Sequence, residues 1–129
     1  MSAEEVKPDI ETRQDIDWVM RQFYTRLLAD DRIAYLFTEV ARINLEEHLP
    51  HLGHFWESIL FDHNDYAKNV MQIHANLHRR SPLSPEHFEI WLGYLHDTID
   101  SRFAGERAQK MKDRARGIAY VMKAKVLHL

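Results

Sequence analysis

His74 and His78 lie four residues apart in residues 67–78, a segment that the spacing of its apolar residues predicts to be a short helix. Residues at i and i+4 project from the same helical face, so the pair has the spacing of a two-histidine metal clamp. One of them could instead be a single axial ligand, with the other incidental. A third histidine, His48, stands at the end of an apolar stripe on another predicted helix. These three histidines therefore indicate metal binding by imidazoles.

Three imidazoles suit zinc, and a zinc-dependent helical hydrolase with His48, His74 and His78 as ligands is one hypothesis. Such an enzyme also needs a general base, and no glutamate stands beside the pair. Its immediate neighbours are Gln72, Ile73, Ala75 and Asn76. A ligandless helical interaction module is a further alternative.

Haem is the other metal group that these residues suit. Its iron requires a neutral imidazole that points into an apolar slot, and His74 shares its helical face with the apolar Met71 and Leu77. Haem also needs flat apolar walls. Side chains that could supply them are Phe37, Phe55, Phe88 and Trp91. A guanidinium at the helix end, Arg79, could meet a propionate.

Helices would position all of these residues. Helical spacing of apolar residues occurs in residues 15–30, 32–37, 44–60, 67–78 and 106–126. Ser84 is predicted to cap a further helix, with Pro85 at its first position and a stop near Gly105. Because the sequence has no period-2 strand pattern and no repeat, we expect an all-α fold.

The polar break after residue 60 would let the two helices on either side of it run back across each other. His48 and His74 could then face one another across an apolar gap. Between them the two helices would supply both sides of a cofactor site.

Composition narrows the class of protein. The 129 residues fit one domain, which we place at residues 13–129 after a flexible lead-in of residues 1–12. A net charge of −3 argues against nucleic-acid binding. The absence of cysteine excludes disulfides, thiolate zinc sites, Fe–S clusters and cysteine nucleophiles. Because there is no secretory signal and no apolar run of about 20 residues, we expect a cytoplasmic protein without a membrane segment. We also expect the protein to be a monomer.

An ordered set of short motifs resembles the truncated haemoglobins of group III. The motifs are FY (residues 23–24), YLF (35–37), EEHLPHLGHFWESIL (46–60), VMQIHANL (70–77) and SPEHFEIWL (84–92). The match runs from about residue 15 to about residue 123, nearly the whole chain. Group III proteins lack the glycine-pair motifs of other truncated globins, and this chain has none.

The resemblance implies a truncated globin fold, a 2-on-2 helical sandwich around a haem pocket, with haem b as cofactor. It implies polar distal residues at Tyr24, His48 and Trp91. The residues expected to contact haem are Phe37, Leu52, Phe55, Met71, Leu77, Arg79, Phe88 and Trp91. For the proximal ligand of the iron we favour His74, since it fits the H-x-x-L pattern of the proximal helix. His78 suits the spacing of members with a shorter connection.

The function implied is binding of O2, NO or CO at a pentacoordinate or histidine-gated iron, for redox chemistry or sensing rather than bulk O2 delivery. His48 would either gate ligand access or coordinate the iron when no ligand is present. An NO dioxygenase or peroxidase-like activity would need an external reductase, because the chain has no recognisable flavin or nicotinamide segment.

Overall fold

The computed structural model describes residues 6–61 and 83–126, and all regular structure in these residues is helical. The all-α prediction is therefore confirmed. The predicted short helix at residues 67–78 lies outside the described residues. Within the described part of the chain, no helix combines the length and apolar character needed to cross a membrane.

Helix α1 spans Arg13–Leu28 and begins with a capping box. The Thr12 hydroxyl accepts the N–H of Asp15, and the Asp15 carboxylate accepts the N–H of Thr12 in return. The buried residues of α1 recur at steps of three and four, so one face of the helix enters the core. They are Ile16, Val19, Met20, Phe23, Tyr24 and Leu27. Tyr24 is thus directed inward by the same pattern that buries its apolar neighbours.

Two short helices follow α1. Helix α2 spans Asp31–Tyr35, and η1, a π-helix, spans Leu36–Val40. The N–H of Ala41 donates to the carbonyl of Leu36, five residues earlier, which is the π-helical pattern. The sequence predicted helical turns that reach Phe37, whereas the helical path continues to Val40. Arg42 then has a φ of 52°, in the left-handed region, and redirects the chain toward α3.

Helix α3 spans Leu45–Leu60 and is capped by Asn44, whose side chain accepts the N–H of Glu47. Pro50 lies inside this helix. The helix nevertheless begins before this proline, at Leu45. Helix α5 spans Pro85–Arg102, with Ser84 as its cap and Pro85 at its first position, as predicted. Helix α6 spans Glu106–Val126.

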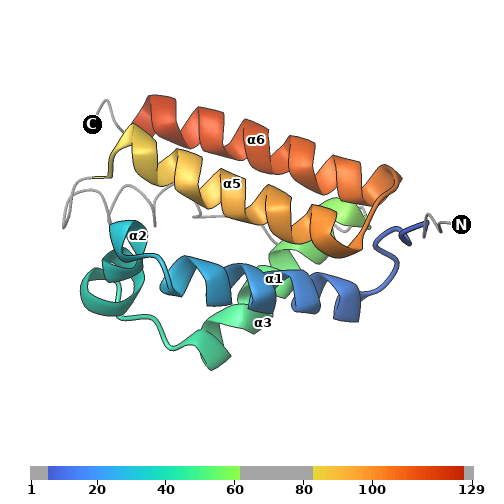
Figure 1. The fold of residues 1–129 in the computed structure, drawn as a ribbon, viewed down its shortest axis with the longest axis horizontal. Helices are drawn as coiled ribbons and strands as arrows, with labels where there is room; N and C mark the ends of the chain where they lie inside the picture. Colours follow the sequence, from blue (N-terminus) through green and yellow to red (C-terminus); the bar gives the residue numbers. More distant parts are fainter. Residues whose placement is uncertain (1–5, 62–82, 127–129) are drawn as a thin grey trace, which may run out of the picture.

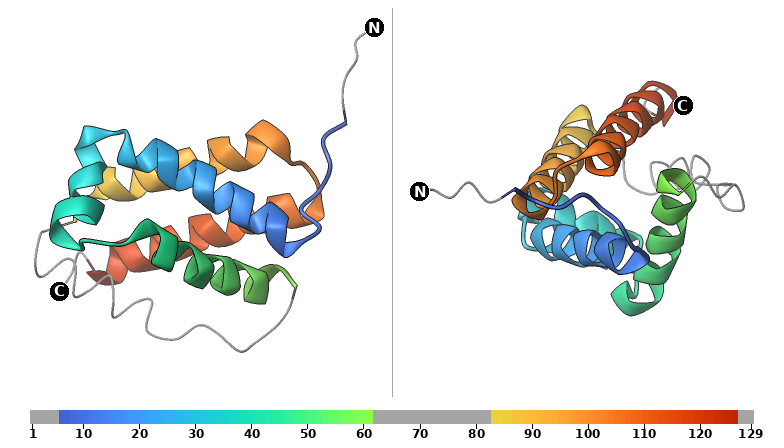
Figure 2. Two further views of the ribbon diagram at one scale, coloured as in Figure 1. Left: turned by 90° about the horizontal axis from the view of Figure 1, so that it is seen from below. Right: turned by 90° about the vertical axis from the view of Figure 1, so that its right-hand side faces the viewer.

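The helices form two layers (Figures 1 and 2). α5 and α6 lie side by side in one layer, and α1 with α3 forms the other. α1 packs on α3 and α5, and α3 also touches α6, so all four helices share one core. The predicted 2-on-2 helical sandwich is therefore observed.

The turn between α5 and α6 is held by a residue near the other end of the chain. The Asp9 carboxylate accepts the N–H groups of Arg107 (2.9 Å) and Ala108 (2.8 Å), and so caps α6. Gly105 in this turn has a φ of +143°, and a Cβ there would lie 2.5 Å from Asp9 Cγ. The turn therefore requires glycine at this position.

Residues next to Asp9 also pack on the folded chain. Ile10 is fully buried, and the N–H of Ala104 donates to the carbonyl of Pro8 (2.9 Å). The sequence indicated only a flexible lead-in over residues 1–12. Residues 8–10 instead form part of the packed domain.

Candidate functional site

The candidate site is built around Tyr24, on the inner face of α1. The Tyr24 side chain is 4% exposed, and its Oη lies 3.3 Å from Nε2 of the half-buried His48 on α3. The two rings meet nearly at right angles, with centroids 5.6 Å apart. Two of the three polar residues that the family resemblance singles out, Tyr24 and His48, therefore contact each other in the structure.

Burial raises the pKa of Tyr24 far above its ordinary value, because a phenolate would lose its hydration in this setting. The hydroxyl consequently keeps its proton at any physiological pH. It can donate one hydrogen bond, either to His48 or to a small molecule that takes its place.

Aromatic rings enclose Tyr24 on its other sides. Phe37, carried by η1, meets it edge to face with ring centroids 5.5 Å apart. Phe23, its neighbour on α1, meets it at 5.2 Å and also meets Trp91 of α5 at 5.9 Å. Phe23 thus connects Tyr24 with Trp91. The sequence placed Phe23 in a motif but gave it no role, because only the fold shows which two rings it lies between.

Three further predicted contact residues lie on α3 and α5. Leu52, Phe55 and Phe88 are partly buried and pack against the same core as Tyr24. The Phe55 ring also meets the buried Trp56 at 5.4 Å. The rings that meet Tyr24 itself are those of Phe23, Phe37 and His48.

Comparison with models of protein families finds no match. The chain is 26% identical over 110 residues to the group 3 truncated hemoglobin ctb of Campylobacter jejuni, across 83% of this chain and 84% of that protein. The crystal structure of a group III truncated hemoglobin from Campylobacter jejuni matches it with a TM-score of 0.81 and 22% identity. That match covers 94% of this chain and 95% of the other.

The predicted resemblance to the group III truncated haemoglobins is confirmed. In this truncated globin fold, the pair formed by Tyr24 and His48 joins the two helices of one layer, and Trp91 comes from the other. The predicted polar residues thus come from both layers.

The predicted proximal half of the truncated globin site lies outside the described residues. This applies to both candidate iron ligands, His74 and His78, and to Met71, Leu77 and Arg79. Within residues 6–61 and 83–126, no group of three histidine or acidic side chains is placed to hold a metal ion. The zinc hypothesis needs His74 and His78, which lie outside the described residues, so the structure does not test it.

Two histidines to which the sequence assigned no role, His87 and His96, make specific contacts. Nε2 of His96 lies 3.1 Å from the carbonyl oxygen of Lys112, which joins α5 to α6. His87 is bonded to Ser84 and to Tyr35. The position of His87, three residues after the capping Ser84, was the available signal, but a capping box ordinarily has Glu or Gln there.

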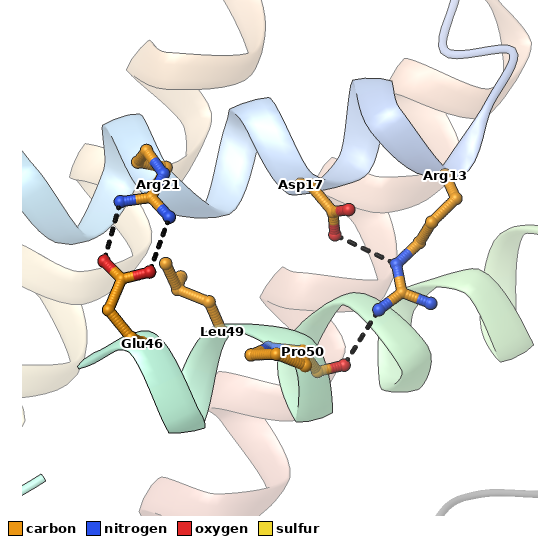
Figure 3. A pocket seen from close by; sticks show the side chains of 6 residues that line it. All are labelled: Arg13, Asp17, Arg21, Glu46, Leu49 and Pro50. Carbon is orange, nitrogen blue, oxygen red and sulfur yellow. Dashed lines mark hydrogen bonds and ion pairs between the residues drawn. The ribbon is translucent and has the colours of Figure 1, made fainter. Parts of the chain in front are cut away.

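A polar recess of about 170 Å³ lies between α1 and α3, away from the aromatic cluster (Figure 3). Arg21 pairs with Glu46 through two hydrogen bonds of 3.1 Å, and Arg13 donates to the carbonyl of Pro50 (3.0 Å). Exposed ion pairs of this kind contribute about 0–1 kcal/mol. These bonds connect α1 with the first turns of α3, which carry His48.

Proposed function

We propose that this chain is a haem protein that binds the diatomic gases O2, NO and CO. The observation that carries the proposal is the buried hydroxyl of Tyr24, bonded to His48 and surrounded by aromatic rings in a group III truncated globin fold. The residues proposed to hold haem b are Phe37, Leu52, Phe55, Met71, Leu77, Arg79, Phe88 and Trp91, with His74 as the proximal ligand.

The chemistry of the described side chains fits this cofactor. Tyr24 is a neutral donor, since burial keeps its phenol protonated. The rings that touch it belong to Phe23, Phe37 and His48. A neutral donor in apolar surroundings suits an uncharged diatomic ligand.

When bound, haem would supply a ferrous iron at which a diatomic ligand is held and polarised. The Tyr24 hydroxyl would then turn from His48 and donate its hydrogen bond to that ligand. The indole N–H of Trp91 is the second proposed donor. The hydrogen bond between His48 and the Tyr24 hydroxyl would form when no ligand is present and break when one binds. In this way His48 would control the access of the ligand.

Two donors imply slow ligand release. Each hydrogen bond is worth on the order of 1 kcal/mol, and more where water is excluded. Two such bonds would slow O2 dissociation by roughly one to three orders of magnitude. Such retention suits redox chemistry on a bound gas, or sensing, better than O2 delivery. Turnover as an NO dioxygenase or a peroxidase-like enzyme would require electrons from a separate reductase.

One absorption experiment tests the cofactor and its ligand together. Haem is titrated into the purified chain and into the His74→Ala and His78→Ala variants, and the Soret band is recorded. We expect a stoichiometric Soret band for the parent and for His78→Ala, and its loss in His74→Ala. A band lost only in His78→Ala would show that His78, and not His74, is the proximal ligand.

A second measurement separates haem from the zinc alternative. The metal content of the protein as purified is determined by elemental analysis. A colourless chain that takes up no haem and carries stoichiometric zinc would overturn the proposal.

A further inference from the structure

Helix α5 begins with an unusual capping box that uses an imidazole. The N–H of His87 donates to Ser84 Oγ (3.3 Å), and the N–H of Ser84 donates to His87 Nδ1 (3.0 Å). A backbone N–H can only donate, so Nδ1 must accept and carries no proton. A neutral His87 therefore has its single ring proton on Nε2.

That proton has a defined acceptor. His87 Nε2 lies 3.2 Å from Oη of Tyr35, the last residue of α2, and the two rings meet edge to face at 5.9 Å. With the tautomer fixed by Ser84, the Nε2–H donates to the Tyr35 oxygen. His87 thus joins the start of α5 to the end of α2 by one directed hydrogen bond.

A second bond holds the other end of α2 to the same helix. Asp30 caps α2, and its Oδ2 accepts a hydrogen bond from Tyr94 of α5 at 2.8 Å. Helix α2 is therefore tied to α5 at both ends. The bond between Tyr35 and His87 is the one next to η1.

η1 needs such a support because it is a single π-helical stretch of five residues, followed by Arg42 in the left-handed region. A π-helix this short has little stability of its own. It nevertheless carries Phe37, whose ring meets Tyr24 at 5.5 Å. The path from His87 to Tyr24 therefore runs through Tyr35 and Phe37.

We infer that Tyr35 and His87 form a positioning pair, which holds η1 so that the Phe37 ring keeps the Tyr24 hydroxyl directed into the site. The pair itself touches neither the cofactor nor the gas. Its influence on bound O2 rests on the proposed function, whereas the tautomer of His87 and the contact of Phe37 with Tyr24 do not.

The test uses Tyr35→Phe, which removes only the acceptor oxygen. In the haem-loaded chain we expect O2 to dissociate about three- to tenfold faster, the range that corresponds to one hydrogen bond. The C–O stretching frequency of the CO complex should shift in the same direction as in Tyr24→Phe. In a Tyr24→Phe background, Tyr35→Phe should change neither value further. Additive effects, or an unchanged rate, would overturn the inference.

Two control variants separate positioning from general stability. Ser84→Ala removes one half of the cap but keeps the Tyr35 bond, so it should lower the unfolding midpoint while the O2 rate stays within about twofold. Tyr120→Phe removes a hydroxyl from a side chain of α6 that is 71% exposed, and should change neither. If Ser84→Ala accelerates O2 release as much as Tyr35→Phe, the effect is one of helix stability and the inference fails.

NMR on the chain without haem tests the pair independently of gas binding. ¹⁵N shifts should place the single ring proton of His87 on Nε2, and a proton on Nδ1 would contradict the argument. Ring-to-ring NOEs between Phe37 and Tyr24 should weaken in Tyr35→Phe, and their full retention would refute the positioning role. If the chain does not bind haem, the proposed function is wrong. The ¹⁵N shifts and the NOEs then still test whether Tyr35 and His87 position Phe37.

Discussion

Replacing Tyr24 with phenylalanine removes one hydroxyl and leaves the surrounding packing in place. The ring contacts with Phe23, Phe37 and His48 are made by the aromatic ring, which phenylalanine retains. Because the His48 partner is only half-buried, its imidazole is not stranded in a dry core by the change. We therefore expect the free energy of unfolding to change by less than about 1 kcal/mol.

The size of the effect on O2 follows from what the hydroxyl gives up. Its oxygen lies 3.3 Å from Nε2 of His48, which is beyond the range of about 2.7–3.2 Å that is usual for a hydrogen bond between nitrogen and oxygen. Turning toward a ligand thus sacrifices a weak bond and forms a stronger one. A net gain of about 1–1.4 kcal/mol means that Tyr24→Phe should raise the O2 dissociation rate about five- to tenfold.

The assay is displacement of O2 by CO in a stopped-flow instrument, with the haem-loaded parent and variant compared at one temperature and pH. Tyr120→Phe, the same chemical change at an exposed site, is the matched control and should leave the rate unchanged. A rate for Tyr24→Phe within twofold of the parent would remove Tyr24 from the mechanism.

A double-mutant cycle with His48→Leu then asks whether the imidazole acts through the phenol. Because Tyr24 and His48 share one hydrogen bond, their effects on the O2 rate should not be additive. Strictly additive effects would show that His48 acts on the ligand without involving Tyr24.

Three further substitutions test other features of the structure. Gly117→Ala, at an exposed α6 position with nothing within 4 Å of the added Cβ, should raise stability by about 0.5–1 kcal/mol in urea unfolding. Burial raises the pKa of Asp9, but the N–H groups that donate to its carboxylate lower it by more, so the pKa is below its ordinary value. The carboxylate therefore contributes to the free energy of unfolding at neutral pH, and this contribution is lost as the pH falls below about 4. In Asp9→Asn, the loss of stability in acid should be smaller. Phe23→Leu should cost about 1 kcal/mol of stability and shift the CO stretch, because Tyr24 and Trp91 lose their shared ring.

The sequence predicted what depends on periodicity. The stripe on α3 gave His48 a place beside the core, because spacing decides which side of a helix a residue occupies. The assignment of Tyr24 came from the family resemblance. The start of α5 followed from Ser84 and Pro85 for a similar reason, since capping is a local interaction. The arrangement of both layers came from the family resemblance rather than from local pattern.

What could not be predicted depends on residues far apart in the chain. The role of Phe23 between two rings needs α5 in position, and the protonated nitrogen of His87 needs both the cap and Tyr35. The burial of Ile10 likewise results from a contact that no local pattern encodes. Propensity also gave no sign of η1, since a single π-turn is stabilised by its surroundings.

The contact between Asp9 and the start of α6 also sets a limit on when the protein can fold. Asp9 is synthesised early, whereas Arg107 and Ala108, its partners, lie 98 and 99 residues later. On the ribosome, the contact of Asp9 with Arg107 and Ala108 cannot form until the beginning of α6 has left the exit tunnel. Until then α6 lacks its cap, so the nascent chain must complete its two-layered core after translation of α6 has begun.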